Sequence, residues 1–444
     1  MQIPQGKMFE GVLSRTIKTT EAAKKVRPFT KKISQEAHQA AAEGRPTAYC
    51  FILGLYDEII RTMGITPIWT ENYSAISTIK RQAERFISSA QSEGFPRNLC
   101  TYCTIQEGFD ALRAQQGGQM PPDCPDGGLE KPSMLLGTGM MICDPRYKSY
   151  QIAQRYIDVP IHITDLLWPP VDCNLKEVQD YYVKHTIEEL RDLVDFLEKQ
   201  TGTKMDWDEL DRKIALSNKT IEVWHAAYQL RKAIPAPMPT EDALNTMVPG
   251  YFWMGTQEAL DYYQDLYNEV QDRVKNKLGV IPDEKYRLVW AFGLPPWFAL
   301  VLFNYFESLG AVFPIEVTYH PSPPVEIPST AKHPLEKLAW RFFKQLTRNH
   351  DRAKNHTGDA QVEWLLDMIE QYKIDGVVAH RANTCRTIHA GQMHVLHVLK
   401  DNIDIPTLIL ESDICDVMAF DEAKIRANID SFVEVLAEDK KRKS

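Results

Sequence analysis

Three cysteines stand where a thiolate could reach a ligand held at the edge of a sheet. Cys143 ends the glycine-containing run LLGTGMMIC, and Cys385 follows the stretch DGVVAHRANT and precedes the helical stretch 389–401. Cys100 comes shortly after a helix that should end near Gly94. Because open α/β sheets bind ligands where their strands end, these three thiols could converge between two domains. Such an arrangement would suit a metal cluster held by thiolates.

Cys103 adds a fourth thiol, in a Cys-x-x-Cys spacing with Cys100. This spacing can bind zinc or take part in redox exchange. A zinc site needs a second matched pair of ligands, however, and Cys124 offers only one further thiol. The spacing therefore gives zinc little support and leaves the role of Cys103 open.

The other cysteines are expected to be structural. The chain has 8 cysteines in 444 residues, which is more typical of reduced thiols, metal ligands or core residues than of a disulfide framework. Free cysteine is commonly buried, and Cys50 lies within a strand-like run. We assign no role to Cys173 or Cys415.

His380 is the histidine best placed to make polar contacts with a bound ligand, because it ends an apolar run close to Cys385. It could instead anchor a loop. His389, His394 and His397 fall on the expected helix 389–401, where a histidine is more often a surface residue than a ligand. The sequence contains no HExxH zinc motif and no nucleophile elbow.

Signatures of nucleotide binding are also missing. The segment GTGMM at 137–141 lacks the third glycine of a dinucleotide fingerprint, and no GxxxxGK[ST] loop occurs. If the reaction uses ATP or NAD, another chain must bind that nucleotide.

Apolar runs and helical stretches alternate in two sets along the chain, which predicts parallel sheets covered by helices. The expected fold class is therefore α/β with two parallel-sheet units. An amphipathic pattern predicts a helix over 78–94 in the first set. The expected strands are 47–54, 65–69 and 133–143 in the first set and 286–293, 311–319, 374–380 and 405–412 in the second.

Two long helical stretches, 180–202 and 206–233, separate the two sets and have acidic residues near their starts, as the helix dipole favours. A chain of this length exceeds what one core usually organises. We therefore expect a first α/β domain with N-terminal helices at 1–178, a helical bridge at 179–240 and a second α/β domain at 241–444.

Charge and hydropathy argue against two classes of partner. Lys and Arg total 51 against 60 Asp and Glu, which gives a net charge of −9, and no block of basic residues stands out. Nucleic acid is therefore not an expected partner. The start has no apolar signal core, and no apolar run reaches the roughly 18 to 20 residues that cross a bilayer. We expect a cytoplasmic protein that does not enter a membrane.

Five segments carry a resemblance to a known family. They resemble the benzoyl-CoA reductase and 2-hydroxyacyl-CoA dehydratase family over most of the chain, and within it are most similar to a large subunit of the ATP-dependent benzoyl-CoA reductases. The segments are LCTYCTIQEG (99–108), LLGTGMMICDPRYKSYQIAQRYIDVPIHI (135–163), EKYRLVWAFGLPPW (284–297), DGVVAHRANTCRTIHAGQMHVLHVLKDNIDIPTLILESD (375–413) and RANIDSFVEVL (426–436).

The resemblance implies two Rossmann-like domains with a helical portion, and a 4Fe-4S cluster with one iron site left open. Its ligands would be Cys100, Cys143 and Cys385, so that the cluster would lie between the domains. Cys103 has no counterpart in the family pattern, which leaves a four-thiolate cluster open. A double-cubane cluster also occurs in the family.

The implied activity is low-potential electron transfer to an aromatic acyl-CoA thioester, giving a cyclic dienoyl-CoA, as in anaerobic aromatic degradation. The implied partners are a homologous second subunit in a hetero-oligomer and a separate ATP-hydrolysing iron-sulfur protein that donates electrons. Ring reduction also needs protons, which His380 or Glu411 could supply, although Glu411 could equally serve the strand end. Trp297 and the proline-rich loop 320–329 could form walls of an acyl pocket.

Three alternatives share these features. The first is a 2-hydroxyacyl-CoA dehydratase subunit that acts through a ketyl radical and recycles its electron, whereas a reductase consumes electrons. The second is a double-cubane-type reductase. The third is a non-catalytic subunit that holds a cluster, or only a thiol, and acts as a structural or electron-relay subunit. The sequence leaves open the acyl group, the subunit that holds the substrate and the number of irons in the cluster.

Overall fold

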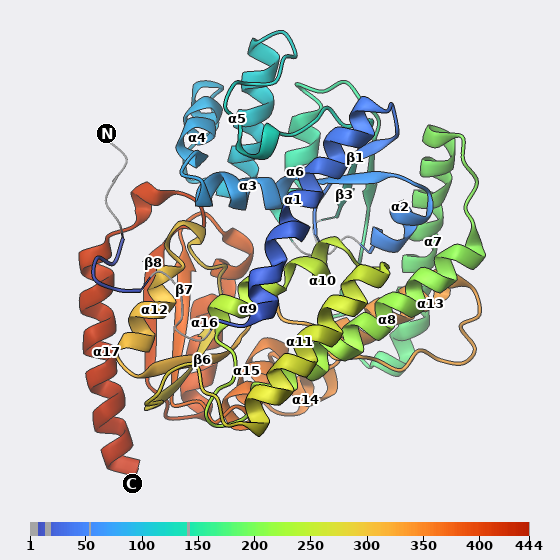
Figure 1. The fold of residues 1–444 in the computed structure, drawn as a ribbon. Helices are drawn as coiled ribbons and strands as arrows, with labels where there is room; N and C mark the ends of the chain where they lie inside the picture. Colours follow the sequence, from blue (N-terminus) through green and yellow to red (C-terminus); the bar gives the residue numbers. More distant parts are fainter. Residues whose placement is uncertain (1–7, 14–18, 53–54, 140–142, 444) are drawn as a thin grey trace.

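Two separate parallel sheets form the framework of the molecule (Figure 1). The computed structural model describes residues 8–13, 19–52, 55–139 and 143–443. Each sheet has 4 strands, and every pair of neighbouring strands is parallel. The predicted α/β class with two parallel-sheet units is therefore confirmed.

The first sheet has the strand order β2-β1-β3-β4. Its strands are β1 (Thr47–Cys50), β2 (Thr66–Trp69), β3 (Met134–Thr138) and β4 (Ile161–Thr164). The first three are buried along their whole length, which is why they read as continuous apolar runs. Edge strand β4 is largely half-buried and has no such run. Segments 53–54 and 140–142, which we expected to extend β1 and β3, lie outside the described residues.

The second sheet repeats this topology in the order β6-β5-β7-β8. Its strands are β5 (Tyr286–Ala291), β6 (Ala311–Glu316), β7 (Gly376–Ala382) and β8 (Thr407–Ser412). In both sheets the strand order reverses beside the first strand, between β1 and β3 and between β5 and β7. Open α/β sheets bind ligands at such a reversal, outside the carboxyl ends of the strands.

Helices surround both sheets. Those of the first part of the chain are α1 (Glu21–Ala42), α2 (Asp57–Thr62), α3 (Thr70–Ile79), α4 (Ala83–Ser92), α5 (Thr101–Gln115), the 3-10 helix η1 (Pro125–Gly127) and α6 (Asp144–Ala153). Those of the later part are α9 (Thr240–Thr246), α10 (Val248–Phe252), α11 (Gln257–Lys275), η2 (Trp297–Ala299), α12 (Val301–Ser308), α13 (Pro334–Leu346), α14 (His350–Asn355), α15 (Ala360–Gln371), α16 (Arg386–Asn402), η3 (Val417–Ala419) and α17 (Glu422–Lys443). Helix α1 crosses the middle of the molecule and packs against α9, α10 and strand β2 (Figure 1).

The two helices predicted for the bridge are present as α7 (Leu175–Thr201) and α8 (Trp207–Leu230). Helix α7 begins at an Asn174 N-cap and ends before Gly202, whose φ of +70° suits glycine. The predicted boundary between residues 178 and 179 falls inside α7. The three domain ranges stay a prediction.

One predicted helix is wrong. The helix expected over 78–94 is interrupted, because α3 ends at Ile79 and α4 begins only at Ala83. Arg81, between them, has a φ of +60°, which does not continue a right-handed helix. Its guanidinium donates a hydrogen bond to the carbonyl oxygen of Phe298 at 3.1 Å. A contact with a distant segment thus accompanies a break that apolar periodicity does not reveal.

Candidate metal-cluster site

Each of the three predicted ligands stands at the N-cap position of a helix. Cys100 precedes α5, Cys143 precedes α6 and Cys385 precedes α16. Backbone N–H groups in the first turns of two of these helices, those of Arg146 and Ile388, hydrogen-bond the thiols of Cys143 and Cys385 and favour their thiolate forms. The first turn of a helix has N–H groups without intrahelical partners and a partial positive charge, and both favour a thiolate.

These three thiols and Cys103 interact electrostatically, and we call the four of them the thiol cluster. The hydrogen bond of Cys103 to Cys100, together with burial, raises the pKa of Cys103 well above its usual value. Burial raises the pKa of Cys143 to about 11, and the charge of Cys100 adds to the effect. Burial raises the pKa of Cys385 to about 12, helped by the charges of Cys100 and Cys143. Raised pKa values of this kind disfavour the thiolate forms of Cys103, Cys143 and Cys385 unless a cation lies among them.

Two of the thiols occupy corresponding places in the two sheets. Cys143 follows β3 and Cys385 follows β7, and each strand lies at the reversal of its sheet. The thiol of Cys143 also hydrogen-bonds Thr387 in the first turn of α16. Asp144 and Arg386, which directly follow the two cysteines, form an ion pair at 3.4 Å. The carboxyl ends of the two sheets therefore meet at the thiol cluster.

This arrangement differs from a site for one metal ion. Among the residues that the structure describes, no group of three His, Cys, Asp or Glu side chains could hold a single ion. In an iron-sulfur cluster the thiolates bind different irons, so their sulfurs need not converge on one point. The soft donors, their mutual repulsion when ionised and the three helix N-termini fit such a cluster better than zinc. The role of Cys100, Cys143 and Cys385 as its ligands stays a prediction.

A series of aromatic side chains begins at helix α5, which carries Cys103. Trp297, which is 6% exposed, donates a hydrogen bond from Nε1 to the hydroxyl of Tyr102, the residue before Cys103. The rings of Trp297 and Tyr319 lie 5.9 Å apart, and those of Tyr319 and Tyr251 lie 5.4 Å apart. The hydroxyl of Tyr251 donates to the carbonyl of His320, the first residue of the proline-rich loop, at 3.3 Å. These side chains, which we call the aromatic wall, thus run from α5 to that loop.

Glu71 is a carboxyl group near the thiol cluster that the sequence analysis missed. It lies in the first turn of α3, and its Oε2 accepts a hydrogen bond from the backbone N–H of Ile52 at 3.1 Å. Burial raises its pKa, and the charge of Arg146 opposes this effect. The charge of Glu71 in turn raises the pKa of Cys143 and of Tyr319. Its position just after strand β2 is the signal that could have identified it.

His380 lies in β7 with both ring nitrogens engaged. Nδ1 is 2.6 Å from the carbonyl oxygen of Leu294, and Nε2 is 2.6 Å from Oγ of Ser412. Burial lowers its pKa to about 4, so the ring is neutral at pH 7. This geometry suits the anchoring of a loop better than the release of a proton. The proton-donor role of His380 stays a prediction.

Glu411 lies on an exposed part of β8. Its side chain is 46% exposed and forms ion pairs with Arg381 at 3.2 Å and Lys424 at 3.5 Å. The buried carboxylate of this region is Asp413, two residues further on. The proton-donor role of Glu411 also stays a prediction. Glu71 is less exposed than Glu411, and its charge acts on Cys143 in the thiol cluster.

The remaining cysteines have no predicted ligand role. Cys50 is fully buried in β1, so its predicted place in the core is confirmed. Cys415 is also buried, and burial raises its pKa with a contribution from the charge of Cys100. The sulfur of Cys173, which is half-buried, lies 3.5 Å from Nε2 of His350. Cys124 is half-buried near the 3-10 helix η1.

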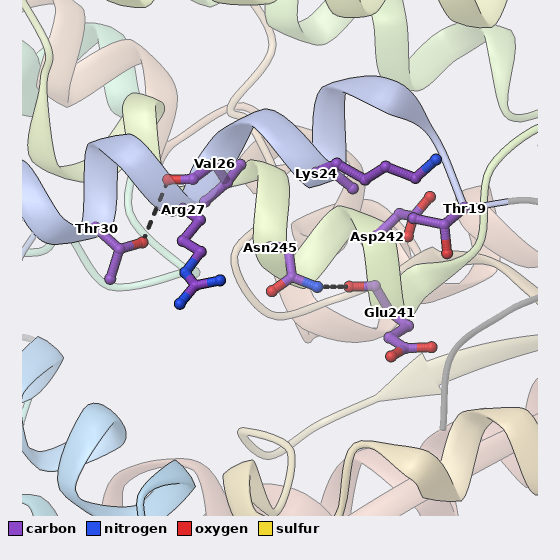
Figure 2. A pocket seen from close by; sticks show the side chains of 9 residues that line it. Thr19, Lys24, Val26, Arg27, Thr30, Glu241, Asp242 and Asn245 are labelled. Atoms are coloured by element: carbon purple, nitrogen blue, oxygen red, sulfur yellow. Dashed lines mark hydrogen bonds between the residues drawn. The ribbon is translucent and has the colours of Figure 1, made fainter. Parts of the chain in front are cut away.

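A hollow of about 490 Å³ lies elsewhere, between α1 and α9 (Figure 2). Its lining includes Lys24 and Arg27 from α1 and Asp242 and Asn245 from α9. Figure 2 shows the guanidinium of Arg27 extending away from α1, and the amide of Asn245 hydrogen-bonded to the backbone of Glu241. None of the residues predicted for the site lines this hollow. The candidate site therefore rests on the thiol cluster.

Comparison with known proteins establishes the family. Residues 56–436 match the family model described as 2-hydroxyglutaryl-CoA dehydratase, D-component. The chain belongs to this family. The match confirms the family resemblance predicted from the five segments and covers all four members of the thiol cluster.

Relatives in this family include both dehydratases and a reductase. The alpha subunit of (R)-2-hydroxyisocaproyl-CoA dehydratase from Clostridioides difficile is 24% identical, over 91% of this chain and 93% of the relative. The alpha subunit of (R)-phenyllactyl-CoA dehydratase from Clostridium sporogenes is 20% identical, over 95% and 97%. A subunit of benzoyl-CoA reductase from Thauera aromatica is 22% identical, over 90% of each chain. Such similar identities do not choose between dehydration and reduction.

No helix in the described part of the chain is both long enough and apolar enough to cross a bilayer.

Proposed function

We propose that this chain is the cluster-bearing catalytic subunit of an enzyme that transfers single electrons to an acyl-CoA thioester, and that an aromatic acyl-CoA is its first candidate substrate. The observation that carries this proposal is the thiol cluster, which places three cysteines at helix N-termini between two sheets. Family membership supports the acyl-CoA class, and the similarity to a benzoyl-CoA reductase subunit supports the aromatic acyl group.

Cys100, Cys143 and Cys385 would hold the iron-sulfur cluster, with Cys103 beside them. When bound, such a cluster supplies a low-potential electron carrier whose potential follows from burial, charge and hydrogen bonds to sulfur. The chain contributes two buried thiols, Cys100 and Cys103, two half-buried ones, Cys143 and Cys385, and the helix N-termini that stabilise negative charge.

The aromatic wall would bind and orient the acyl group. Aromatic rings pack against one another edge-on or offset, and they exclude water from the bound ring. Tyr102, Trp297 and Tyr319 present such surfaces near the thiol cluster. In this proposal Trp297 and the loop 320–329 form walls of the acyl pocket, as the sequence suggests.

Glu71 would hold the proton that the reduced substrate takes up. Its Oε2 accepts from Ile52, which leaves Oε1 to carry the proton. Burial raises its pKa, which is the direction that a general acid requires. Glu411 lacks this environment, and His380 has no free ring nitrogen.

The active enzyme would need two kinds of partner. Relatives of this chain are named as subunits of larger enzymes, which supports a homologous second subunit. The sequence has no nucleotide-binding loop, so an ATP-hydrolysing iron-sulfur protein would deliver the electrons.

Dehydration of a 2-hydroxyacyl-CoA is the second candidate reaction, because two of the similar chains are alpha subunits of such dehydratases. The two reactions differ in electron balance. Reduction of the ring consumes electrons with every product, whereas loss of water from a 2-hydroxyacyl-CoA leaves the redox state of the substrate and product pair unchanged.

The assay that separates them uses the anaerobically purified complex with ATP and a low-potential electron donor. It measures donor oxidised per product formed, first with benzoyl-CoA and then with (R)-2-hydroxyisocaproyl-CoA. We expect stoichiometric donor oxidation and a cyclic dienoyl-CoA from benzoyl-CoA. Catalytic donor use with an enoyl-CoA product would establish the second candidate, and turnover of neither would contradict both.

A further inference from the structure

A buried carboxylate outside the proposed catalytic set connects two of the thiol-bearing segments. Asp413 is 0% exposed and directly follows β8. Its Oδ1 accepts hydrogen bonds from the Thr101 hydroxyl at 2.8 Å and from the backbone N–H groups of Cys415 and Asp416 at 3.0 and 3.1 Å. Its Oδ2 accepts from the N–H of Thr384 at 3.1 Å and from its hydroxyl at 2.6 Å. All these donors suit an ionised carboxylate, which can only accept.

The two threonines stand beside two members of the thiol cluster. Thr101 follows Cys100 at the start of α5, and Thr384 precedes Cys385 at the start of α16. The backbone N–H of Thr101 also donates to the hydroxyl of Thr384 at 3.3 Å. Asp413 therefore joins a segment of the first sheet unit to a segment of the second, one residue from a thiol on each side.

The hydrogen-bonded group of Asp413, Thr101 and Thr384, which we call the threonine junction, should resist deformation. The carboxylate and its donors are buried, so water cannot replace a hydrogen bond that is lost. Several charge-assisted bonds share one acceptor, which fixes the positions of both hydroxyl groups relative to each other. The bonds of Asp413 reach the segments of Cys100 and Cys385, whereas Cys143 contacts Thr387 instead.

We infer that Asp413 is a positioning residue that fixes the separation of Cys100 and Cys385 before any iron binds. This role rests on the proposed function. If the two thiols are already in place, the segments lose less conformational entropy when the cluster assembles. It acts through Thr101 and Thr384 and contacts no reacting atom.

The chain offers a matched control in Asp416. This carboxylate is 5% exposed and binds the guanidinium of Arg97 at 2.6 and 2.7 Å, which also joins the two sheet units. It does not bond the residues beside the thiols. Asp416→Asn therefore removes a comparable contact between the units but leaves the threonine junction in place.

The first test measures the rates at which Cys100 and Cys385 are alkylated in the iron-free, reduced protein, with mass spectrometry of the labelled peptides. Asp413→Asn should raise both rates about tenfold or more, because the loosened segments open more often. Thr384→Val should also raise both alkylation rates. Thr384→Ser, which keeps the hydroxyl, should show the rates of the parent protein. Asp416→Asn should change either rate less than about twofold. Equal effects of Asp413→Asn and Asp416→Asn would overturn the inference.

The second test reconstitutes each variant anaerobically with iron and sulfide and records its EPR spectrum. Asp413→Asn should assemble the cluster several times more slowly than Asp416→Asn. A parent protein that binds no iron would remove the proposed function, but the alkylation rates would still decide whether Asp413 positions the thiols. If Asp413→Asn does not fold, Thr384→Val replaces it in both tests.

Discussion

Glu71 and Glu411 have the same side chain and different surroundings. Glu71 follows β2, is buried enough for its pKa to rise, and acts electrostatically on Cys143. Glu411 has its charge matched at the surface by Arg381 and Lys424. The three cysteines could be selected from the sequence, because the end of an apolar run and the start of a helix are visible there. The choice among carboxyl groups could not, since burial and neighbours arise only from tertiary structure.

This difference predicts that two conservative substitutions affect kcat to very different extents. Glu71→Gln should lower kcat by about 10² to 10⁴-fold, the usual contribution of a general acid, while the iron content stays at the parent level. Glu411→Gln should leave kcat within about twofold, because an exposed ion pair contributes little. Steady-state assays of both variants check this prediction. A large loss in Glu411→Gln with full activity in Glu71→Gln would reverse the assignment.

Glu107 predicts a pH dependence of stability in the iron-free protein. It is 2% exposed, its Oε2 has no hydrogen-bond partner among the described residues, and burial raises its pKa to about 7. Between pH 4.5 and pH 7 the unfolded chain releases a proton that the folded chain retains, so folding stability falls as the pH rises. The total loss is about 3 kcal/mol.

Glu107→Gln removes this titration. The free energy of unfolding of the variant, relative to the parent, should therefore rise by about 3 kcal/mol between pH 4.5 and pH 8. Urea unfolding at both pH values measures it. A difference between variant and parent that does not change with pH would show that the buried carboxyl is stabilised in its charged form.

Helices α4 and α5 show how one element fixes another. Gly108 in α5 lies so close to α4 that an added Cβ atom would overlap the backbone carbonyl of Phe86. Cys100 is the N-cap of α5, and Cys103 lies in its first turn. The sequence predicted the buried strands because buried parallel strands are continuous apolar runs, and it missed the edge strand β4, which is largely half-buried. It missed the break at Arg81, because neither the positive φ of this residue nor its contact with Phe298 is visible in apolar periodicity.

Two glycine substitutions should change the free energy of unfolding in opposite directions. Gly108→Ala should lower the free energy of unfolding by about 3 kcal/mol or more, because a backbone atom cannot move aside as a side chain can. Gly391→Ala, at an exposed position of α16 where an added Cβ meets nothing within 4 Å, should raise it by about 0.5 to 1 kcal/mol. Urea unfolding of the three proteins gives both values. A neutral Gly108→Ala would contradict the close approach of the two helices.

The whole molecule brings two sheets of the same topology together at their carboxyl ends. Contacts between Arg97 and Asp416, Trp297 and Tyr102, and the Asp413 junction hold this meeting place. Two α/β units could be predicted from alternating runs, and the family resemblance placed a cluster between them. The sequence could not show the contacts that join the units, because their partners lie hundreds of residues apart and none forms a local motif.

The proposed function requires the thiol cluster to hold iron and sulfide. Its most direct test is the iron and acid-labile sulfide content, with EPR, of anaerobically purified parent protein, Cys143→Ala and Cys50→Ala. The parent and Cys50→Ala should each contain about four irons per chain, and Cys143→Ala should lose most of them, since Cys50 is a core residue of β1. An iron-free parent, or a Cys143→Ala variant that keeps its full iron content, would contradict the account.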